Sequence, residues 1–258
     1  SYSPFTNAAE NTTGWLIAKY DAINRKILTA WMPGTTDSNG RNSLQSIYNS
    51  QSSNLLNEQK STSNSTVNGV VFRYTNVAYP TTGFHVLTIN YFDDYNFPNA
   101  PTSFSFTMHN NSQPVFYNNS TQKPKGLATG NWVRVLETNN DTNAETSHIL
   151  YDFKARAIRT RKNNYLGGYT QVDASLDFSG KTIYSEIKHR RINTSAEIYI
   201  RENFEYTPQD RLRKHTHQIG TAGAVEMLAF YEYNELGQLL NKRVGGANSA
   251  SPTGLQKI

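Results

Sequence analysis

The residues best placed to do chemistry are two histidines, His215 and His217. Alternate residues of a strand face the same side, so this pair together with a third ligand could bind a metal ion. No third ligand can be identified in the sequence. The spacing equally fits polar side chains on the wet face of a sheet, and we favour that interpretation. We therefore expect no metal and no other cofactor.

The neighbouring acids Asp93 and Asp94 raise the possibility of a catalytic carboxylate pair or a calcium site. Adjacent strand residues point to opposite faces, however, so these two carboxylates should not converge; the start of a turn is the better interpretation. A glycosidase would need a convergent acid pair, and none can be located. The sequence also lacks Gly-x-Ser-x-Gly, His-Glu-x-x-His and phosphate-binding-loop motifs. We therefore predict no catalytic residues and no enzymatic activity.

The composition favours a chain of sheets that are wet on one face. Only 36% of the 258 residues are hydrophobic and the mean hydropathy is −0.64, yet aromatic residues reach 12%. Many Tyr, Thr and Asn suit half-exposed strands, and the aromatic content argues against disorder. Cysteine is absent, which excludes disulfides, thiolate metal sites and a cysteine nucleophile.

The formal charge is +5 and the sequence pI is about 9.2. The densest basic run, Lys188–Arg191, raises the possibility of a nucleic-acid groove. Acids alternate with the bases around it, among them Glu186 and Glu205, so a solvated set of strand faces is the better interpretation. We predict no nucleic-acid partner.

No apolar run approaches the roughly 18–20 residues that span a bilayer, so we predict no membrane span. The sequence begins with Ser1, and no basic-then-apolar signal sequence follows it. We expect a processed product or a part of a longer protein.

Five short segments share one pattern: a leading aromatic or Leu, an acid or turn former, two spacers, a turn residue and a base or amide. They are Tyr20–Arg25, Tyr151–Arg156, Leu176–Lys181, Tyr206–Arg211 and Tyr233–Gln238. We call them the hexads. The predicted structural residues in them are Tyr20, Asp21, Asn24, Arg25, Tyr151, Asp152, Arg156, Asp177, Gly180, Lys181, Tyr206, Asp210, Arg211, Tyr233, Asn234 and Gly237.

Each hexad predicts a tight turn between two strands. Its second residue can accept backbone N–H bonds, as in Asx-turns. Its fifth position should have positive φ and is filled mainly by Asn, Asp or Gly; Ala155 departs from this and predicts a different turn or mild strain. The sixth residue can pair with the acid of its own or a neighbouring hexad. The leading aromatic should pack on its counterpart in the next hexad.

The hexads from Asp152 onward recur every 25, 30 and 27 residues, about one hairpin plus a connection. Such units must stack to bury their faces. β-Branched and aromatic content predicts strands over 15–20, 26–31, 70–74, 85–92, 132–136, 146–151, 157–161, 181–189, 196–206 and 225–233. The fold prediction is therefore all-β, an array of antiparallel β-hairpins.

The remaining segments predict less regular structure. Residues 42–56 carry one weak helical pattern after Gly40, which one or two turns of helix or an irregular loop would explain. Residues 57–69 read as a polar connector. The Pro- and Asn-rich stretch 96–131 reads as an excursion or cap, with a short hairpin around 104–108 and 115–117. The predicted organisation is 1–95 with the first repeat, the 96–131 excursion, a 132–245 hairpin array and a 246–258 linker or continuation.

The last two hexads carry a family resemblance. The runs Phe204–Leu212 and Tyr231–Leu240 resemble two copies of the Tyr-x-Tyr-Asp-x-x-Gly-Arg-Leu unit of rearrangement-hotspot (RHS) proteins. These YD-repeat proteins are related to the toxin-complex and teneurin shells. The likeness is strongest over 145–245. Residues 14–21, 127–130 and 214–218 also resemble RHS proteins, in particular those of Bacteroidota.

The resemblance implies part of a curled hollow β-shell around a C-terminal toxin or cargo used in interbacterial competition. The implied partners are the remainder of the shell, from the same precursor or other chains, and the enclosed cargo. Export is implied to the cell surface or the medium, with type IX secretion components as partners by analogy. Shells of this family often end in an autoprotease region with an Asp-Pro sequence. This chain has no Asp-Pro, so no catalytic residue carries over.

The scattered aromatics leave a second function class open. Rings on a sheet face can stack on sugars, so a carbohydrate-binding β module at the cell surface, with glycans as partners, is the alternative. Saturable quenching of tryptophan fluorescence by polysaccharides would favour that module.

Overall fold

The computed structural model describes residues 2–7, 12–52, 55–105, 113–120, 122–137, 141–246 and 256–257. These residues belong to two compact units, Ser1–Thr102 with Asn118–His148, and Ser103–Tyr117 with Ile149–Ile258. Among the described residues, no helix is long and apolar enough to cross a membrane.

The first unit is a sheet in which each strand runs antiparallel to its neighbours. Its strands, in spatial order, are β1 (Tyr2–Asn7), β2 (Thr12–Tyr20), β3 (Lys26–Pro33), β6 (His85–Phe92), β7 (Ala128–Arg134) and β8 (Ala144–Tyr151). The last three residues of β8 belong to the second unit. Between β3 and β6 the chain forms α1 (Ser38–Asn49) and a separate hairpin of β4 (Lys60–Val67) and β5 (Val70–Tyr74).

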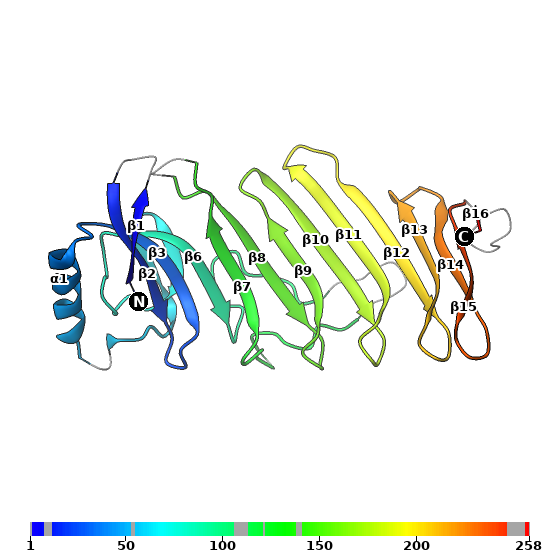
Figure 1. The fold of residues 1–258 in the computed structure, drawn as a ribbon, viewed down its shortest axis with the longest axis horizontal. Coiled ribbons are helices and arrows are strands. Elements are labelled where there is room, and N and C mark those ends of the chain that lie inside the picture. The colour runs from blue at the N-terminus through cyan, green and yellow to red at the C-terminus, as the bar shows by residue number, and fades with distance from the viewer. Residues whose placement is uncertain are drawn as a thin grey trace. The chain divides into compact units, whose positions relative to one another are not determined.

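The second unit continues the same architecture with consecutive antiparallel strands. They are β9 (Ala157–Asn163), β10 (Gly167–Leu176), β11 (Thr182–Ile192), β12 (Ile198–Tyr206), β13 (Leu212–Ile219), β14 (Val225–Tyr233), β15 (Leu239–Val244) and β16 (Gln256–Lys257). Figure 1 shows the β10–β11, β12–β13 and β14–β15 turns at the same edge of this sheet, at the bottom of the view.

The all-β prediction is confirmed, and antiparallel hairpins are its building unit. Strand order in each unit follows the chain, and within neither unit do the first and last described strands pair. The sheets described are thus open, and the curled hollow shell stays a prediction.

The helix is real but differs from its predicted extent. It begins at Ser38, before Gly40, because the Asp37 side chain caps it by accepting from the Gly40 N–H at 2.8 Å. It ends at Asn49, and none of its residues is buried. Gly40 is therefore inside the helix rather than a break before it.

The predicted polar connector 57–69 is wrong, because most of it is strand β4. The hairpin to β5 turns at Asn68-Gly69, whose φ angles are 45° and 79°. An Asn-Gly pair with two positive φ angles is a strong two-residue hairpin signal. The sequence therefore contained the cue, but the Ser- and Thr-rich strand concealed it.

Other predicted elements shift in detail. The strand predicted over 132–136 runs from Ala128 to Arg134 instead. Its buried side chains are Thr129 and Arg134, and Arg134 Nε donates to the Val86 carbonyl at 2.7 Å. The predicted excursion hairpin is not formed at 104–105 or 115–117, and 106–108 lie outside the described residues. The predicted continuation contributes β16, which pairs with the end of β15.

The core of the first unit lies between the β4–β5 hairpin and the sheet. Tyr74 of β5 stacks on Tyr91 of β6 with ring centroids 5.7 Å apart, and Tyr91 stacks on Phe97 at 4.5 Å. The Lys60 ammonium lies 5.2 Å from the Tyr74 centroid and is paired with Asp94. This hairpin therefore covers the sheet with an aromatic layer that also holds a cation.

A buried ion pair joins the hairpin region to β2. Lys19 Nζ lies 2.9 Å from Glu58 Oε1, with side-chain exposures of 4% and 1%. Glu58 also accepts from the Thr75 hydroxyl and from the backbone N–H groups of Val77 and Ala78. Burial lowers the pKa of Lys19, and Glu58 partly offsets this. The full set of partners makes the buried carboxylate tolerable.

Candidate functional site

The five hexads all fold into the same kind of turn, one in the first unit and four in the second, and these turns are the candidate functional site. In all five, the second residue donates its N–H to the sixth residue's carbonyl, and the fifth donates to the second's carbonyl, at 2.8 to 3.2 Å. A type I turn followed by one left-handed residue gives this pattern. The leading residue forms a bulge in four of the hairpins, at Tyr20, Leu176, Tyr206 and Tyr233.

The fifth position has positive φ in every hexad, as predicted. The values are 65° for Asn24, 59° for Ala155, 101° for Gly180, 63° for Asp210 and 77° for Gly237. Ala155 thus adopts the common turn with unfavourable backbone geometry, and the alternative of a different turn is wrong.

The second residue organises each turn through its side chain. Asp152 Oδ1 accepts from the Lys154 and Arg156 N–H groups, and its Oδ2 accepts from Arg156 Nε at 2.7 Å. In the same way, Asp21 Oδ1 accepts from the Ile23 and Arg25 N–H groups, and its Oδ2 accepts from Arg25 Nε. Burial raises the pKa of Asp152, but the bonds from Arg156 and Lys154 outweigh it and leave the pKa below its ordinary value.

The other three turns are variants of this arrangement. Asp177 accepts from the Gly180 and Lys181 N–H groups, and the Lys181 ammonium is the main cause that lowers the pKa of Asp177. Thr207 Oγ1 accepts the Arg211 N–H at 3.2 Å. Asn234 Oδ1 accepts the Gln238 N–H at 2.8 Å. A hydroxyl or an amide therefore keeps the backbone bond and loses the ion pair.

The sixth residue links its own turn to the following one. Lys181 Nζ lies 2.9 Å from Asp177 and 2.7 Å from Asp210 of the next hexad. Arg156 Nη1 donates to the Asp177 carbonyl at 2.7 Å. The base of one hairpin thus contacts the turn of its neighbour, as the pairing prediction allowed.

The leading tyrosines complete this linkage in a way the sequence did not predict. Tyr206 donates to the Thr182 carbonyl at 2.9 Å, and Tyr233 donates to the Leu212 carbonyl at 2.8 Å. Each ring also lies beside the preceding base, Lys181 at 5.4 Å and Arg211 at 5.9 Å. No ring contact joins Tyr206 to Tyr233 in the described part of the chain, so the predicted aromatic packing is wrong for this pair.

A sixth turn of this kind is divided by the excursion. Asp93 donates its N–H to the Leu127 carbonyl at 3.1 Å, and its Oδ1 accepts from the Gly126 N–H at 2.7 Å. Gly126 has a φ of 82°, and Phe92 forms the bulge. Asp93 and Gly126 therefore take the second and fifth positions, with residues 94–125 inserted between them. This turn differs from the hexads in that Gly126 donates to the Asp93 side chain and not to its carbonyl, and Asp93 has a φ of 71°.

The two acids of this split turn diverge, as predicted. Asp93 pairs with the Arg25 guanidinium, whose Nη1 donates at 3.0 Å, whereas Asp94 pairs with Lys60. The Arg25 bond is the main cause that lowers the pKa of Asp93. Arg25 thereby links its own turn to the split one, just as Lys181 links two turns of the second unit.

The opposite edge of the second sheet repeats the turn chemistry once more. Asn164 donates its N–H to the Gly168 carbonyl at 3.0 Å, and its Oδ1 accepts from Leu166 and Gly168. Gly167 has a φ of 82°. The turn at Gly167-Gly168 is therefore of the hexad type, although neither a leading aromatic nor a base in the sixth position marks it in the sequence.

One face of the second sheet carries a polar row that the sequence did not reveal. Five directly opposed residues on β9 to β13 form it: Arg159, Asp173, Glu186, Arg201 and Gln218. Asp173 and Glu186, 1% and 3% exposed, are thus two buried acids directly opposite each other on neighbouring strands, which the sequence pattern did not reveal.

Both acids are already bonded within the sheet. Asp173 accepts from Arg159 and from Gln171 Nε2 at 2.7 Å. Glu186 Oε1 accepts from the Tyr184 and Tyr199 hydroxyls at 3.0 and 2.6 Å. Burial is the main cause that raises the pKa of Tyr184, which keeps this hydroxyl a donor. The row therefore contains two hydrogen-bonded groups, one around Asp173 and one that runs from Glu186 through Tyr199 to Arg201 and Gln218.

The two histidines bond to acids on neighbouring strands. His215 Nε2 lies 3.0 Å from Glu202, and His217 Nε2 lies 3.2 Å from Glu226. His215 also stacks on Phe204. Among the described residues, no group of three or more His, Cys, Asp or Glu side chains could hold a metal ion.

Comparison with known proteins leaves the assignment to the chain's own geometry. No protein-family model matches the sequence, and the curated proteins include no match to it.

Proposed function

We propose that this chain is a non-catalytic wall segment of a secreted RHS-type shell, which encloses a C-terminal toxin or cargo for delivery in interbacterial competition. The observation that carries the proposal is the repeated turn with its base-to-neighbour contact, seen at Lys181 between Asp177 and Asp210. Repeats that bond chiefly to the next repeat build extended surfaces rather than a closed core.

Two further features support a wall. Consecutive hairpins share the turn edge, where each leading tyrosine of the last two hexads bonds to the preceding repeat. The polar row lines one face of the second unit's sheet with hydrogen-bonded polar side chains instead of a packed apolar layer, as suits a sheet that is not covered by a dry core. The proposed partners are neighbouring wall segments and the enclosed cargo.

The experiment places an affinity tag in the Asn164–Gly168 turn of the protein in its native setting, where the tag leaves the hexads intact. The protein is purified without denaturant and imaged by electron microscopy. We expect a hollow particle with internal density that resists added protease. The same tag inserted between Phe178 and Ser179, inside a hexad, should reduce the yield of particles. Particles without a lumen, or a lone small β protein that binds no further chain, would contradict the proposal.

A further inference from the structure

An open pocket of about 740 Å³ lies between the turn ends of the β12–β13 and β14–β15 hairpins. It exists because pairing between β13 and β14 stops at Lys214 and Phe230, so the strands separate toward their turns. The Tyr233 hydroxyl bridges the gap to the Leu212 carbonyl. We call this space the terminal groove; its volume is within the range of ligand sites, roughly 300–1,000 Å³.

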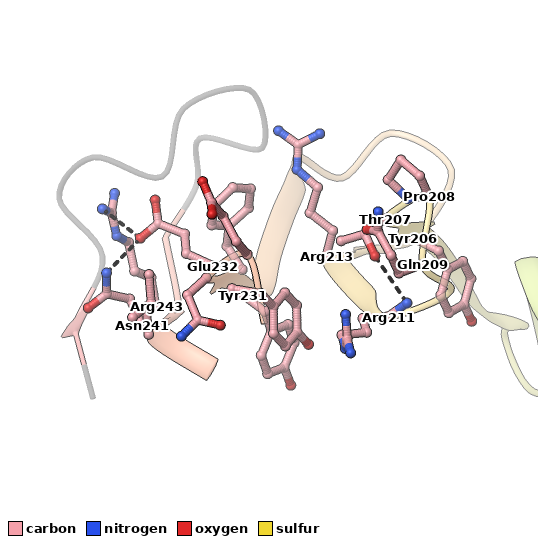
Figure 2. A pocket seen from close by; sticks show the side chains of 15 residues that line it. Tyr206, Thr207, Pro208, Gln209, Arg211, Arg213, Tyr231, Glu232, Asn241 and Arg243 are labelled. Atoms are coloured by element: carbon pink, nitrogen blue, oxygen red, sulfur yellow. Dashed lines mark hydrogen bonds and ion pairs between the residues drawn. The ribbon is translucent and has the colours of Figure 1, made fainter. Parts of the chain in front are cut away.

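The terminal groove is lined by aromatic rings, by the three arginines Arg211, Arg213 and Arg243, and by two acids, Glu232 and Glu235. Glu232 is already paired with Arg243 at 3.2 Å. Tyr231 and Tyr233 lie with ring planes 17° apart and centroids 6.5 Å apart. Arg211 Cζ lies 5.9 Å from the centroid of the Tyr233 ring, and Figure 2 shows the Arg211 and Arg213 side chains extending in opposite directions. Arg211 is thus the cation placed to meet a group entering on the tyrosine side.

Arg211 differs from the other hexad bases because no carboxylate in its own turn balances its charge. Arg25, Arg156 and Lys181 each pair with the acid of their own turn. Thr207 replaces that acid in the fourth hexad and Asn234 replaces it in the fifth, so Arg211 has no carboxylate partner among the described residues. Its guanidinium packs over Gly237 instead, where a Cβ atom would lie 2.1 Å from Arg211 Cζ.

The same unit shows what such a groove accepts. Between the second and third hexads, an extended part of the excursion occupies the corresponding place. Gln113 Nε2 donates to Asp152 at 2.8 Å, and Gln113 Oε1 accepts the Leu176 N–H at 2.6 Å. Phe116 donates its N–H to the Tyr151 carbonyl at 3.0 Å. One side chain of an extended segment therefore joins two successive turns.

We propose that the terminal groove binds an extended peptide segment through an Asp or Glu side chain, which meets Arg211 as Gln113 meets Asp152. The charges are reversed, because the turn contributes the cation Arg211 to the terminal groove and the carboxylate Asp152 to the Gln113 site. The tyrosine rings would hold the apolar side chain beside the acid. This peptide site needs only the second unit's geometry and does not depend on the proposed shell.

The test uses labelled peptides that follow the sequence of residues 113–117. One carries Glu in place of the first Gln (Glu-Pro-Val-Phe-Tyr), one keeps Gln, and one carries Lys. Binding to the whole chain is measured by thermophoresis. We expect saturable binding of the Glu peptide, with the Gln and Lys peptides at least about tenfold weaker, since a charge-assisted bond is lost. Equal binding of all three would overturn the proposal.

Two variants assign the binding to the groove. Arg211→Gln should abolish the preference for Glu, whereas Arg191→Gln, the same charge change at the far end of β11, should leave it unchanged. Thr207→Asp supplies an internal carboxylate, as Asp152 does for Arg156; it should weaken the Glu peptide at least about tenfold without loss of thermal stability. A Thr207→Asp protein that binds as tightly as the parent would refute the role of Arg211.

A competition experiment with a sugar distinguishes a peptide ligand from an acidic glycan. Oligogalacturonate carries carboxylates on rings that could stack on Tyr231. We expect it to compete with the Glu peptide only weakly, because it lacks the backbone groups that Phe116 uses. Competition stronger than that of unlabelled peptide would replace a peptide partner by a sugar and overturn the proposal.

Discussion

Arg25 and Asp93, 68 residues apart, form the ion pair that joins the first hexad to the split turn. Asp93→Asn should lower the free energy of unfolding by about 1–2 kcal/mol at neutral pH, since both side chains remain partly exposed. Urea denaturation measures this, and Asp37→Asn, at the exposed helix cap, is the comparison for a lost carboxylate outside the turns.

The same pair predicts a pH dependence. Arg25 holds the pKa of Asp93 below its ordinary value of 3.8. A carboxyl whose pKa is depressed by folding contributes its stability above the unfolded-state pKa, about 3.9, and loses it as the pH falls through the folded-state pKa. The gap between parent and Asp93→Asn should be full at pH 7 and shrink below about pH 4. A gap that is constant down to pH 2 would show that the pair contributes nothing through charge.

Ala155→Gly should stabilise the protein by about 0.5–1 kcal/mol. The φ of 59° disfavours a side chain, and the relief exceeds the entropy that glycine adds to the unfolded chain. Ala157→Gly, two residues later in β9, should destabilise by a similar amount because its backbone is extended. Thermal melts of the two variants should therefore move in opposite directions.

Gly237→Val should destabilise by more than about 1 kcal/mol, since a β-branched residue meets both a φ of 77° and the Arg211 guanidinium. Gly220→Val isolates the backbone part, because Gly220 has a φ of 72° and no atom within 4 Å of its added Cβ. The difference between the two melts measures the Arg211 contact. A silent Gly237→Val would show that the turn is not held in this form.

Glu58→Gln should destabilise the first unit by about 3–5 kcal/mol, because it leaves the Lys19 ammonium buried without its counter-charge. Replacing both residues, Lys19→Met with Glu58→Leu, should cost much less, since apolar side chains of similar size can fill the space. Chemical denaturation of the single and double variants separates the two outcomes. A double variant as unstable as Glu58→Gln would instead assign the loss to the bonds with Thr75, Val77 and Ala78.

Gln113→Ala should loosen the segment 113–117 from the two turns that it joins within the second unit. The Leu176 N–H loses its acceptor, whereas Asp152 keeps its bonds to Arg156. We expect faster hydrogen exchange at Leu176 and earlier proteolysis after residue 103, with a loss of about 1–2 kcal/mol in stability. Gln209→Ala, in an exposed turn, is the comparison and should change neither measurement.

The hexad turns could be predicted because their chemistry is local. An acid, a turn residue and a base within six positions fix the bonds of Asp152 and Arg156 without reference to distant chain. The strands that flank them follow from composition for the same reason. The β4–β5 hairpin was not predicted, although Asn68-Gly69 is a typical hairpin turn, because β4 consists mainly of Ser and Thr.

The features that could not be predicted depend on residues distant in the sequence or on which side chains share a face of the sheet. Asp93 and Gly126 are separated by the whole excursion, so no short pattern unites them. Asp173 and Glu186 look like ordinary solvated residues in alternating strands, and only the register of β10 against β11 places them opposite each other. Arg211 stands out only when its neighbours' acids are seen in place.

The split turn has one more consequence. Both ends of the excursion are held together at Asp93, whose carboxylate accepts from the Gly126 N–H and whose own N–H donates to the Leu127 carbonyl. These bonds close the β6–β7 hairpin. Changes of length in the exposed part of this segment, away from Phe97 and Gln113, should therefore leave the register of β6 and β7 unchanged. The segment between β6 and β7 is therefore a site that can accept insertions while the pairing of the flanking strands is kept.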